Sequence, residues 1–206
     1  MKSMLAIRFA LSVAFGVDWL GFATTSSGKN ILYLQLEIPA PLLQRRLQAM
    51  KATPTDKLII WTEHNIAIDT NEGMAKIEEA IEDFNIEILI LDPIYKVMSG
   101  NLIENHQVKI FTDRVDSLMA KYSPLSVLLI SHSRKGQYEE AWGSDDLIGG
   151  SFFSNWADGI IGIERISQTR LKAHFDVMRN AEDEILPRVL TVTDDIDFEW
   201  EMGTIV

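Results

Sequence analysis

The chain contains no cysteine among its 206 residues. This absence excludes a disulfide scaffold, a cysteine nucleophile and a thiolate zinc site. Basic residues are also scarce, since 19 Lys and Arg stand against 30 Asp and Glu, for a formal net charge of -11. Binding a polyanion over a whole surface requires clustered Lys and Arg, so the charge leaves room only for a local basic loop.

The N-terminal stretch is apolar, which raises the question of a targeting signal. Residues 1–22 open with Lys2 followed by apolar residues, as a secretory signal does. Arg8 interrupts this run, and the apolar stretches on either side of it are too short to span a bilayer. Because the apolar positions fall near helical spacing, we expect an amphipathic or buried helix in a cytoplasmic protein, with a signal peptide as the alternative.

Apolar residues make up 47% of the chain and charged residues 24%, which excludes intrinsic disorder as the global state. A chain of this length buries about two thirds of its unfolded surface in a single core. The sequence contains no internal repeat and no low-complexity tract. We therefore expect one domain over residues 1–206.

Apolar segments of two kinds alternate along the first two thirds of the chain. Short buried strands are expected at residues 31–36, 58–61, 86–91 and 125–130, and amphipathic helices at 41–50, 72–84 and 108–122. This alternation predicts an α/β fold with a mainly parallel sheet covered on both faces. A polar, glycine-rich connection over 133–157 follows, and strand-like segments at 159–163, 171–178, 188–192 and 197–200 predict an antiparallel meander added to the sheet.

Polar residues end three of the predicted parallel strands, namely Glu37, Asp92 and His132. Open parallel sheets bind ligands outside the carboxyl ends of their strands, so these residues are candidates for a shared site. Asp92 follows an apolar strand, an arrangement that can hold Mg2+ beside a nucleotide. Each residue taken alone is more typical of a cap or a solvated strand end than of a site. A phosphate-binding segment elsewhere in the chain would favour the shared site. Lys2-Ser3, directly before a predicted helix, matches the last dipeptide of one such segment, the Walker A motif G-x-x-x-x-G-K-[ST].

The order of these parts resembles the RecA-like P-loop ATPases, and more closely the RepA-like hexameric replicative helicases, whose core is an AAA ATPase domain. The segments that carry the resemblance are KSMLAIRFALSVAFG, ILYLQLE, ILILDPIYKVMSG, VLLISHSRKG and SNWADGIIGIER. The resemblance implies a RecA-like three-layer sandwich with a C-terminal antiparallel meander. It also implies a homo-oligomeric ring, with no membrane partner, that couples Mg-ATP hydrolysis to single-stranded or duplex DNA in replication or repair.

The resemblance assigns roles to the polar residues at the strand ends and at the start of the chain. Lys2 would neutralise charge on the β- and γ-phosphates, and Ser3 would be a ligand of Mg2+. Glu37 would be the general base that polarises the attacking water. Asp92 would hold Mg2+ through water, and His132 would sense the γ-phosphate.

Four further basic residues receive roles by resemblance. Arg134 and Lys135, in the loop that follows His132, would contact a nucleic-acid backbone. Arg165 and Arg179 are candidates for an arginine that reaches the nucleotide of a neighbouring subunit. For both arginines, an ordinary surface role is the competing interpretation.

The sequence departs from the family pattern at several points. The G-x-x-x-x-G part of Walker A and the strand before it are missing, so we expect the ATPase domain to be N-terminally incomplete and hydrolysis to be absent or very weak. The run 147–151 lacks an arginine that relatives place before Gly-Ser, and Val177 replaces a lysine. Two alternatives follow: a catalytically silent RecA-like binding or assembly subunit, and a metal-dependent phosphoesterase built on Glu37, Asp92 and His132.

Overall fold

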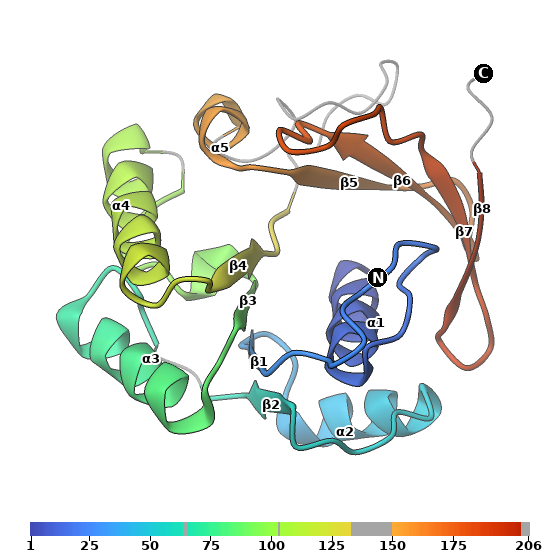
Figure 1. Cartoon of the computed structure of the whole chain (residues 1–206), viewed down its shortest axis with the longest axis horizontal. Helices are drawn as coiled ribbons and strands as arrows, with labels where there is room; N and C mark the ends of the chain where they lie inside the picture. The colour runs from blue at the N-terminus through green and yellow to red at the C-terminus, as the bar shows by residue number, and fades with distance from the viewer. Residues whose placement is uncertain (64–65, 103, 133–149, 203–206) are drawn as a thin grey trace. The chain divides into compact units, whose positions relative to one another are not determined.

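The computed structural model describes residues 1–63, 66–102, 104–132 and 150–202 of the chain (Figure 1). These residues form two compact units, which divide between Ser131 and His132. Each unit contains a four-stranded sheet of its own.

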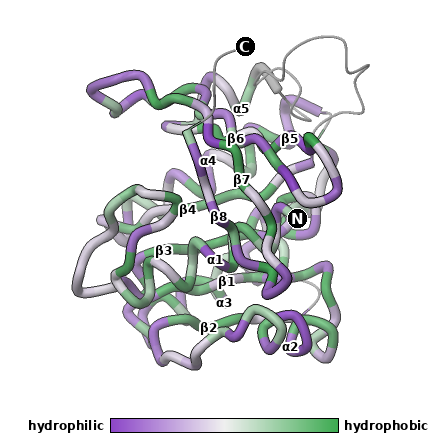
Figure 2. The backbone as a smooth tube through the Cα atoms, turned by 90° about the vertical axis from the view of Figure 1, so that its right-hand side faces the viewer, coloured by the Kyte–Doolittle hydropathy of each residue, from purple (hydrophilic) through white to green (hydrophobic). Residues whose placement is uncertain are grey.

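The first unit contains the predicted parallel sheet. Its strands are β1 (Ile31–Gln35), β2 (Leu58–Trp61), β3 (Ile88–Asp92) and β4 (Ser126–Leu129), in the spatial order β2-β1-β3-β4. All neighbouring pairs are parallel. Every residue of β1 is buried, as expected for an apolar strand covered on both faces, and β1 and β3 stand out as hydrophobic segments in Figure 2.

Four helices cover this sheet and make the three layers of an α/β sandwich. They are α1 (Lys2–Phe15), α2 (Ala40–Ala49), α3 (Asn71–Phe84) and α4 (Asn105–Lys121), and a short 3-10 helix, η1 (Ile94–Lys96), follows β3. Figure 1 shows α1 and α2 on one face of the sheet and α3 and α4 on the other. The expected alternation of strands and crossover helices is confirmed.

Helix α1 confirms the expectation of a buried helix at the start of the chain. Eight of its residues are buried: Met4, Leu5, Ala6, Ile7, Ala10, Leu11, Val13 and Ala14. Arg8 lies among them, and its Nη2 donates a hydrogen bond to the carbonyl oxygen of Met50 at 2.8 Å. Gly16 ends the helix at φ 66°, a left-handed conformation that glycine adopts without a steric penalty. Within the described ranges, no helix is long and apolar enough to cross a membrane.

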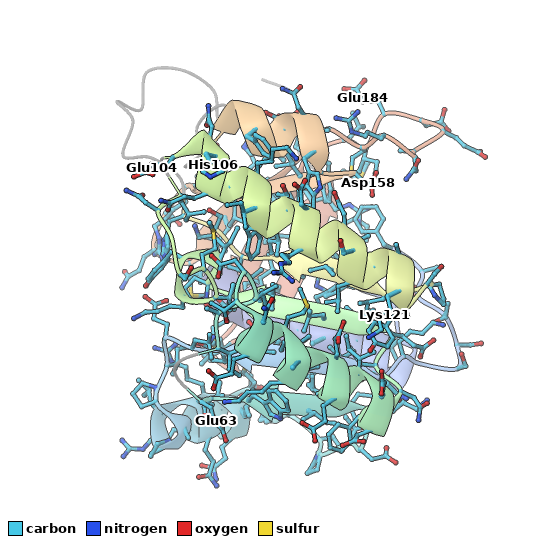
Figure 3. All side chains as sticks on the ribbon, turned by 90° about the vertical axis from the view of Figure 1, so that its left-hand side faces the viewer. Glu63, Glu104, His106, Lys121, Asp158 and Glu184 are labelled. Atoms are coloured by element: carbon cyan, nitrogen blue, oxygen red, sulfur yellow. The ribbon has the colours of Figure 1, made fainter. Side chains whose placement is uncertain are left out.

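Helix α3 begins with a capping side chain, and helix α4 carries side chains that suit the helix dipole at both ends. Thr70 caps α3 by accepting a hydrogen bond from the Gly73 N–H at 3.1 Å. Figure 3 shows Glu104 and Lys121 at opposite ends of α4, an acidic residue before the first turn and a basic one in the last. Lys121 also pairs with Glu78 of α3 at 3.1 Å, which links the two helices.

The second unit contains the predicted C-terminal meander. Helix α5 (Gly150–Trp156) precedes strands β5 (Ile160–Arg165), β6 (Arg170–Asp176), β7 (Arg188–Val192) and β8 (Phe198–Met202). Successive strands pair antiparallel in the order β5-β6-β7-β8. The meander forms a separate sheet and does not extend the parallel one, because consecutive strands joined by turns satisfy one another's backbone hydrogen bonds.

Candidate functional site at the carboxyl edge of the parallel sheet

Asp92 lies at the centre of a hydrogen-bond network at the carboxyl edge of the parallel sheet. It is the last residue of β3, stands in register with Gln35 of β1, and is only 1% exposed. Its Oδ2 accepts hydrogen bonds from the Tyr33 hydroxyl at 2.5 Å and from Gln35 Nε2 at 2.8 Å. The Ser3 side chain donates a further hydrogen bond to this carboxylate. Two predicted site residues, Ser3 and Asp92, are therefore in direct contact.

The environment of Asp92 opposes its ionisation. Burial raises the pKa of the Asp92 carboxyl above its ordinary value, and the hydrogen bonds from Tyr33, Ser3 and Gln35 lower that pKa in part. The Tyr33 hydroxyl has a pKa well above its ordinary value, because it is buried and faces the Asp92 charge. Tyr33 therefore remains a hydrogen-bond donor to this carboxylate at neutral pH.

Lys2 lies at the same edge of the sheet. Its ammonium group donates a hydrogen bond to the carbonyl oxygen of Ser131, just after β4. Burial lowers the pKa of Lys2, whereas the negative charges of Asp92 and Glu37 raise it. The first helical turn and the ends of β1 and β3 thus place one cation beside two carboxylates.

Glu37 follows β1 and is exposed. The Tyr95 hydroxyl, from η1, donates a hydrogen bond to Glu37 Oε1 at 3.2 Å. The pKa of Tyr95 is raised, first by burial of its hydroxyl and then by the Glu37 charge. The carboxylate of Glu37 therefore faces solvent while one of its oxygens is held by a neighbouring side chain.

The other predicted residues are His132, Arg134, Lys135, Arg165 and Arg179. His132 is exposed and is the first residue of the second unit, directly after Ser131. Arg134 and Lys135 fall outside the described residues. Arg165 is exposed, and its Nη1 donates to the Gln168 carbonyl oxygen at 3.3 Å.

Arg179 makes three hydrogen bonds around the end of α5. Its Nε donates to the Ala157 carbonyl oxygen at 2.9 Å, and its Nη2 donates to the carbonyl oxygens of Ser154 at 3.1 Å and Asn155 at 2.8 Å. A cation is favoured where the carboxyl end of a helix leaves carbonyl groups without a partner in the helix. In this structure the Arg179 guanidinium therefore holds α5 within its own unit.

Sequence reasoning missed three residues of the network: Tyr33, Gln35 and Tyr95. The sequence pattern identifies Tyr33 and Gln35 only as members of an apolar strand, because hydrophobic periodicity does not show which polar atoms meet across strands. A glutamine at the end of a fully buried strand was the available signal, since a buried amide requires hydrogen-bond partners. Tyr95 gave no such signal, because its contact with Glu37 depends on how η1 folds after Asp92.

The donor set suits a magnesium-bound nucleotide. A serine hydroxyl and a single carboxylate, touching one another, are oxygen ligands of the kind that Mg2+ accepts when phosphates and water complete its shell. Lys2, beside them, could supply the positive charge that phosphates require. In the part of the chain that the structure describes, no group of three or more His, Asp or Glu side chains is placed to hold a metal ion. Glu37, Asp92 and His132 thus do not form such a cluster there.

The arrangement of the sheet, its covering helices and the separate meander defines a RecA-like α/β fold. A solved structure with this architecture is the KaiC-like protein from the hyperthermophilic archaeon Pyrococcus horikoshii OT3, with a TM-score of 0.64 and 16% sequence identity. The match covers 98% of this chain and 84% of that protein. A family model described as "AAA domain" matches residues 1–138, and the chain belongs to this ATPase family. No curated protein sequence matches the chain.

Proposed function

We propose that this chain is a RecA-like ATPase domain of the RepA-like helicase type, which binds Mg-ATP at the carboxyl edge of its parallel sheet. The observation that carries the proposal is the meeting of Lys2, Ser3, Glu37 and Asp92 at that edge. These residues come from α1 and from the ends of two neighbouring strands. A lysine, a hydroxyl and two carboxylates at one strand edge suit phosphate and Mg2+ chemistry.

Each residue has a distinct part in the proposed reaction. Ser3 and Asp92 would hold the magnesium ion, which supplies charge neutralisation at the phosphates. Lys2 would contact the phosphates directly. Glu37 would accept a proton from the attacking water on a carboxylate oxygen, and its exposure supports access of that water. His132 would report the γ-phosphate to the loop that follows it.

Assembly and nucleic-acid binding belong to the same proposal. We infer a homo-oligomeric ring in which an exposed arginine, Arg165, approaches the nucleotide of the adjacent subunit. Arg179 is the second candidate, but its guanidinium would have to leave three carbonyl groups of the α5 end. Arg134 and Lys135 would contact DNA locally on an otherwise acidic protein. Light scattering with Mg-ATP, and fluorescence anisotropy of a labelled oligonucleotide at several salt concentrations, test the ring and the DNA contact.

The nucleotide site is tested by thermal unfolding with and without Mg-ATP. A ligand that binds only the folded protein stabilises it by about 2.7 kcal/mol at 100 times its Kd. We expect Mg-ATP to raise the Tm of the wild-type chain and not that of Lys2→Met. Lys109→Met removes an exposed lysine of α4 as the matched control and should leave the shift unchanged.

Other results of this Tm measurement would favour a different interpretation of the chain. If millimolar Mg-ATP leaves the wild-type Tm unchanged, the chain is better described as a RecA-like binding or assembly subunit without nucleotide. A shift of equal size in wild-type and Lys2→Met would show that nucleotide binds elsewhere.

A further inference from the structure

The side chain of Gln35 joins two parts of the site that the sequence does not connect. Gln35 is fully buried at the end of β1. Its Nε2 donates to Asp92 Oδ2 at 2.8 Å, and its Oε1 accepts from the backbone N–H groups of Glu37 at 2.9 Å and Ile38 at 3.0 Å. The amide orientation is set by chemistry, because the carboxylate requires a donor and the two N–H groups require an acceptor.

A second link runs between the same two places. The chain leaves β3 at Asp92 and turns into η1, where the Tyr95 hydroxyl contacts Glu37 Oε1 at 3.2 Å. Gln35 thus fixes the backbone of Glu37, and Tyr95 fixes its carboxylate. The Gln35 link connects Glu37 to the Asp92 carboxylate itself, and the Tyr95 link connects Glu37 to the segment that follows Asp92.

Two hydrogen-bond donors to the same oxygen also set the orientation of the Asp92 carboxylate. Tyr33 and Gln35 both bind Oδ2. Burying a polar amide stabilises a protein only when its hydrogen bonds are made, and an apolar residue would fill the same strand position without that requirement. The glutamine therefore serves the two groups that it contacts as well as the packing of β1.

We propose that Gln35 is a positioning residue that couples the orientation of the Asp92 carboxylate to the placement of Glu37, with Tyr95 as the second tie on Glu37. The inference rests on the proposed Mg-ATP site. Outer-shell partners of metal ligands commonly change metal affinity or activity by about 10–100-fold when they are replaced. Gln35 differs from such a partner in that it also holds the loop with the proposed base.

Three variants separate the contact of Gln35 with Asp92 from the contacts that hold Glu37. Gln35→Glu keeps an acceptor for the two N–H groups but turns an oxygen toward Asp92, which disfavours two negative charges at that point. Gln35→Met has a similar size and removes both kinds of contact. Tyr95→Phe keeps the ring and removes only the hydroxyl that holds Glu37.

The main readout is Mn2+ binding in the presence of ATP, followed by the electron paramagnetic resonance signal of free Mn2+. The second is the kcat of ATP hydrolysis, which we expect to be weak already in the wild type. We expect Gln35→Glu to weaken Mn2+ binding about tenfold. Tyr95→Phe should bind Mn2+ like the wild type and show about a 3–10-fold lower kcat. Gln35→Met should show both defects. Substitution of a residue with a purely structural role would change metal affinity and turnover together.

The outcomes distinguish this inference from the proposed function. Wild-type protein that binds no Mn-ATP overturns the proposed function and this inference with it. If the wild type binds Mn-ATP and both Gln35 variants bind Mn2+ within twofold of it, the coupling is wrong while the nucleotide site stands. Circular dichroism verifies the fold of each variant. Should Gln35→Met fail to fold, Gln35→Glu and Tyr95→Phe still decide the question.

Discussion

Asparagine in place of Asp92 is expected to stabilise the protein at neutral pH. Asp92 is 1% exposed, and burial is the main cause of its raised pKa, so its ionised form is the costly one in the folded state. Asparagine has the same shape. Its side-chain oxygen can accept from Tyr33 and Gln35 as Oδ2 does, and its amide can donate to the Ser3 hydroxyl, which also accepts hydrogen bonds.

The sign of the pH dependence follows from the raised pKa. The folded chain binds the Asp92 proton more tightly than the unfolded chain does, so the free energy of unfolding falls as pH rises from the ordinary value of 3.8 through the raised pKa. Above that window the carboxylate destabilises the fold by about 1.4 kcal/mol for each unit by which the pKa is raised. With the hydrogen bonds kept, we expect Asp92→Asn to gain on the order of 1 kcal/mol at pH 7, or about 2–4 °C in Tm.

Thermal unfolding followed by far-ultraviolet circular dichroism measures this gain. The difference in Tm between Asp92→Asn and wild type should be largest at pH 7 and shrink as pH falls and Asp92 takes up its proton. Asp183→Asn, an exposed carboxylate in the second unit, is the matched control and should leave the Tm unchanged. A lower Tm for Asp92→Asn at pH 7 would refute the reasoning, because it would mean that the ionised carboxylate stabilises the fold.

Three further substitutions test local features of the structure. Gly73→Ala places a methyl group 2.0 Å from the Ala67 carbonyl oxygen, so it should lower the Tm although alanine favours helix by about 1 kcal/mol; an unchanged Tm would contradict this close contact. Thr70→Ala removes the cap on the Gly73 N–H and should cost about 1 kcal/mol by urea unfolding, whereas Thr70→Ser should retain most of it. Arg179→Ala should speed amide hydrogen exchange in α5, and equal exchange rates would show that the three carbonyl contacts do not hold the helix.

Metal and nucleotide binding should respond to Asp92→Asn in the opposite direction from stability. Removal of the charge takes away the proposed magnesium ligand while it relieves the burial cost. A trade-off between stability and function is expected where a functional site keeps a charged group buried. If Asp92→Asn loses Mn-ATP binding and has a raised Tm, the Asp92 carboxylate serves function and not stability.

The elements of the first unit could be predicted from local sequence. The strand at 58–61 has the predicted bounds, and the buried strand before Asp92 and the long helix at 105–121 lie within a few residues of those predicted. These elements have strong apolar periods, and burial on both faces of a parallel sheet leaves little choice of conformation. The residues Lys2, Ser3, Glu37 and Asp92 were also within reach, because motif position and strand ends are properties of the sequence.

Tertiary structure decided what these residues touch. The contacts of Asp92 with Tyr33 and Gln35 join strands 57 or more residues apart in the chain, and no local pattern reports such pairing. Gly73 shows the same division: helix propensity alone favours alanine there, and only the approach of the Ala67 backbone forbids it. Local sequence is enough to predict the order of strands and helices along the chain and the residue types at the strand ends, because periodicity and composition act locally. The three-dimensional fold decided the hydrogen-bond network, the separate second sheet and the contacts of Arg179, because these depend on which distant backbone and side-chain groups come within about 3 Å of one another.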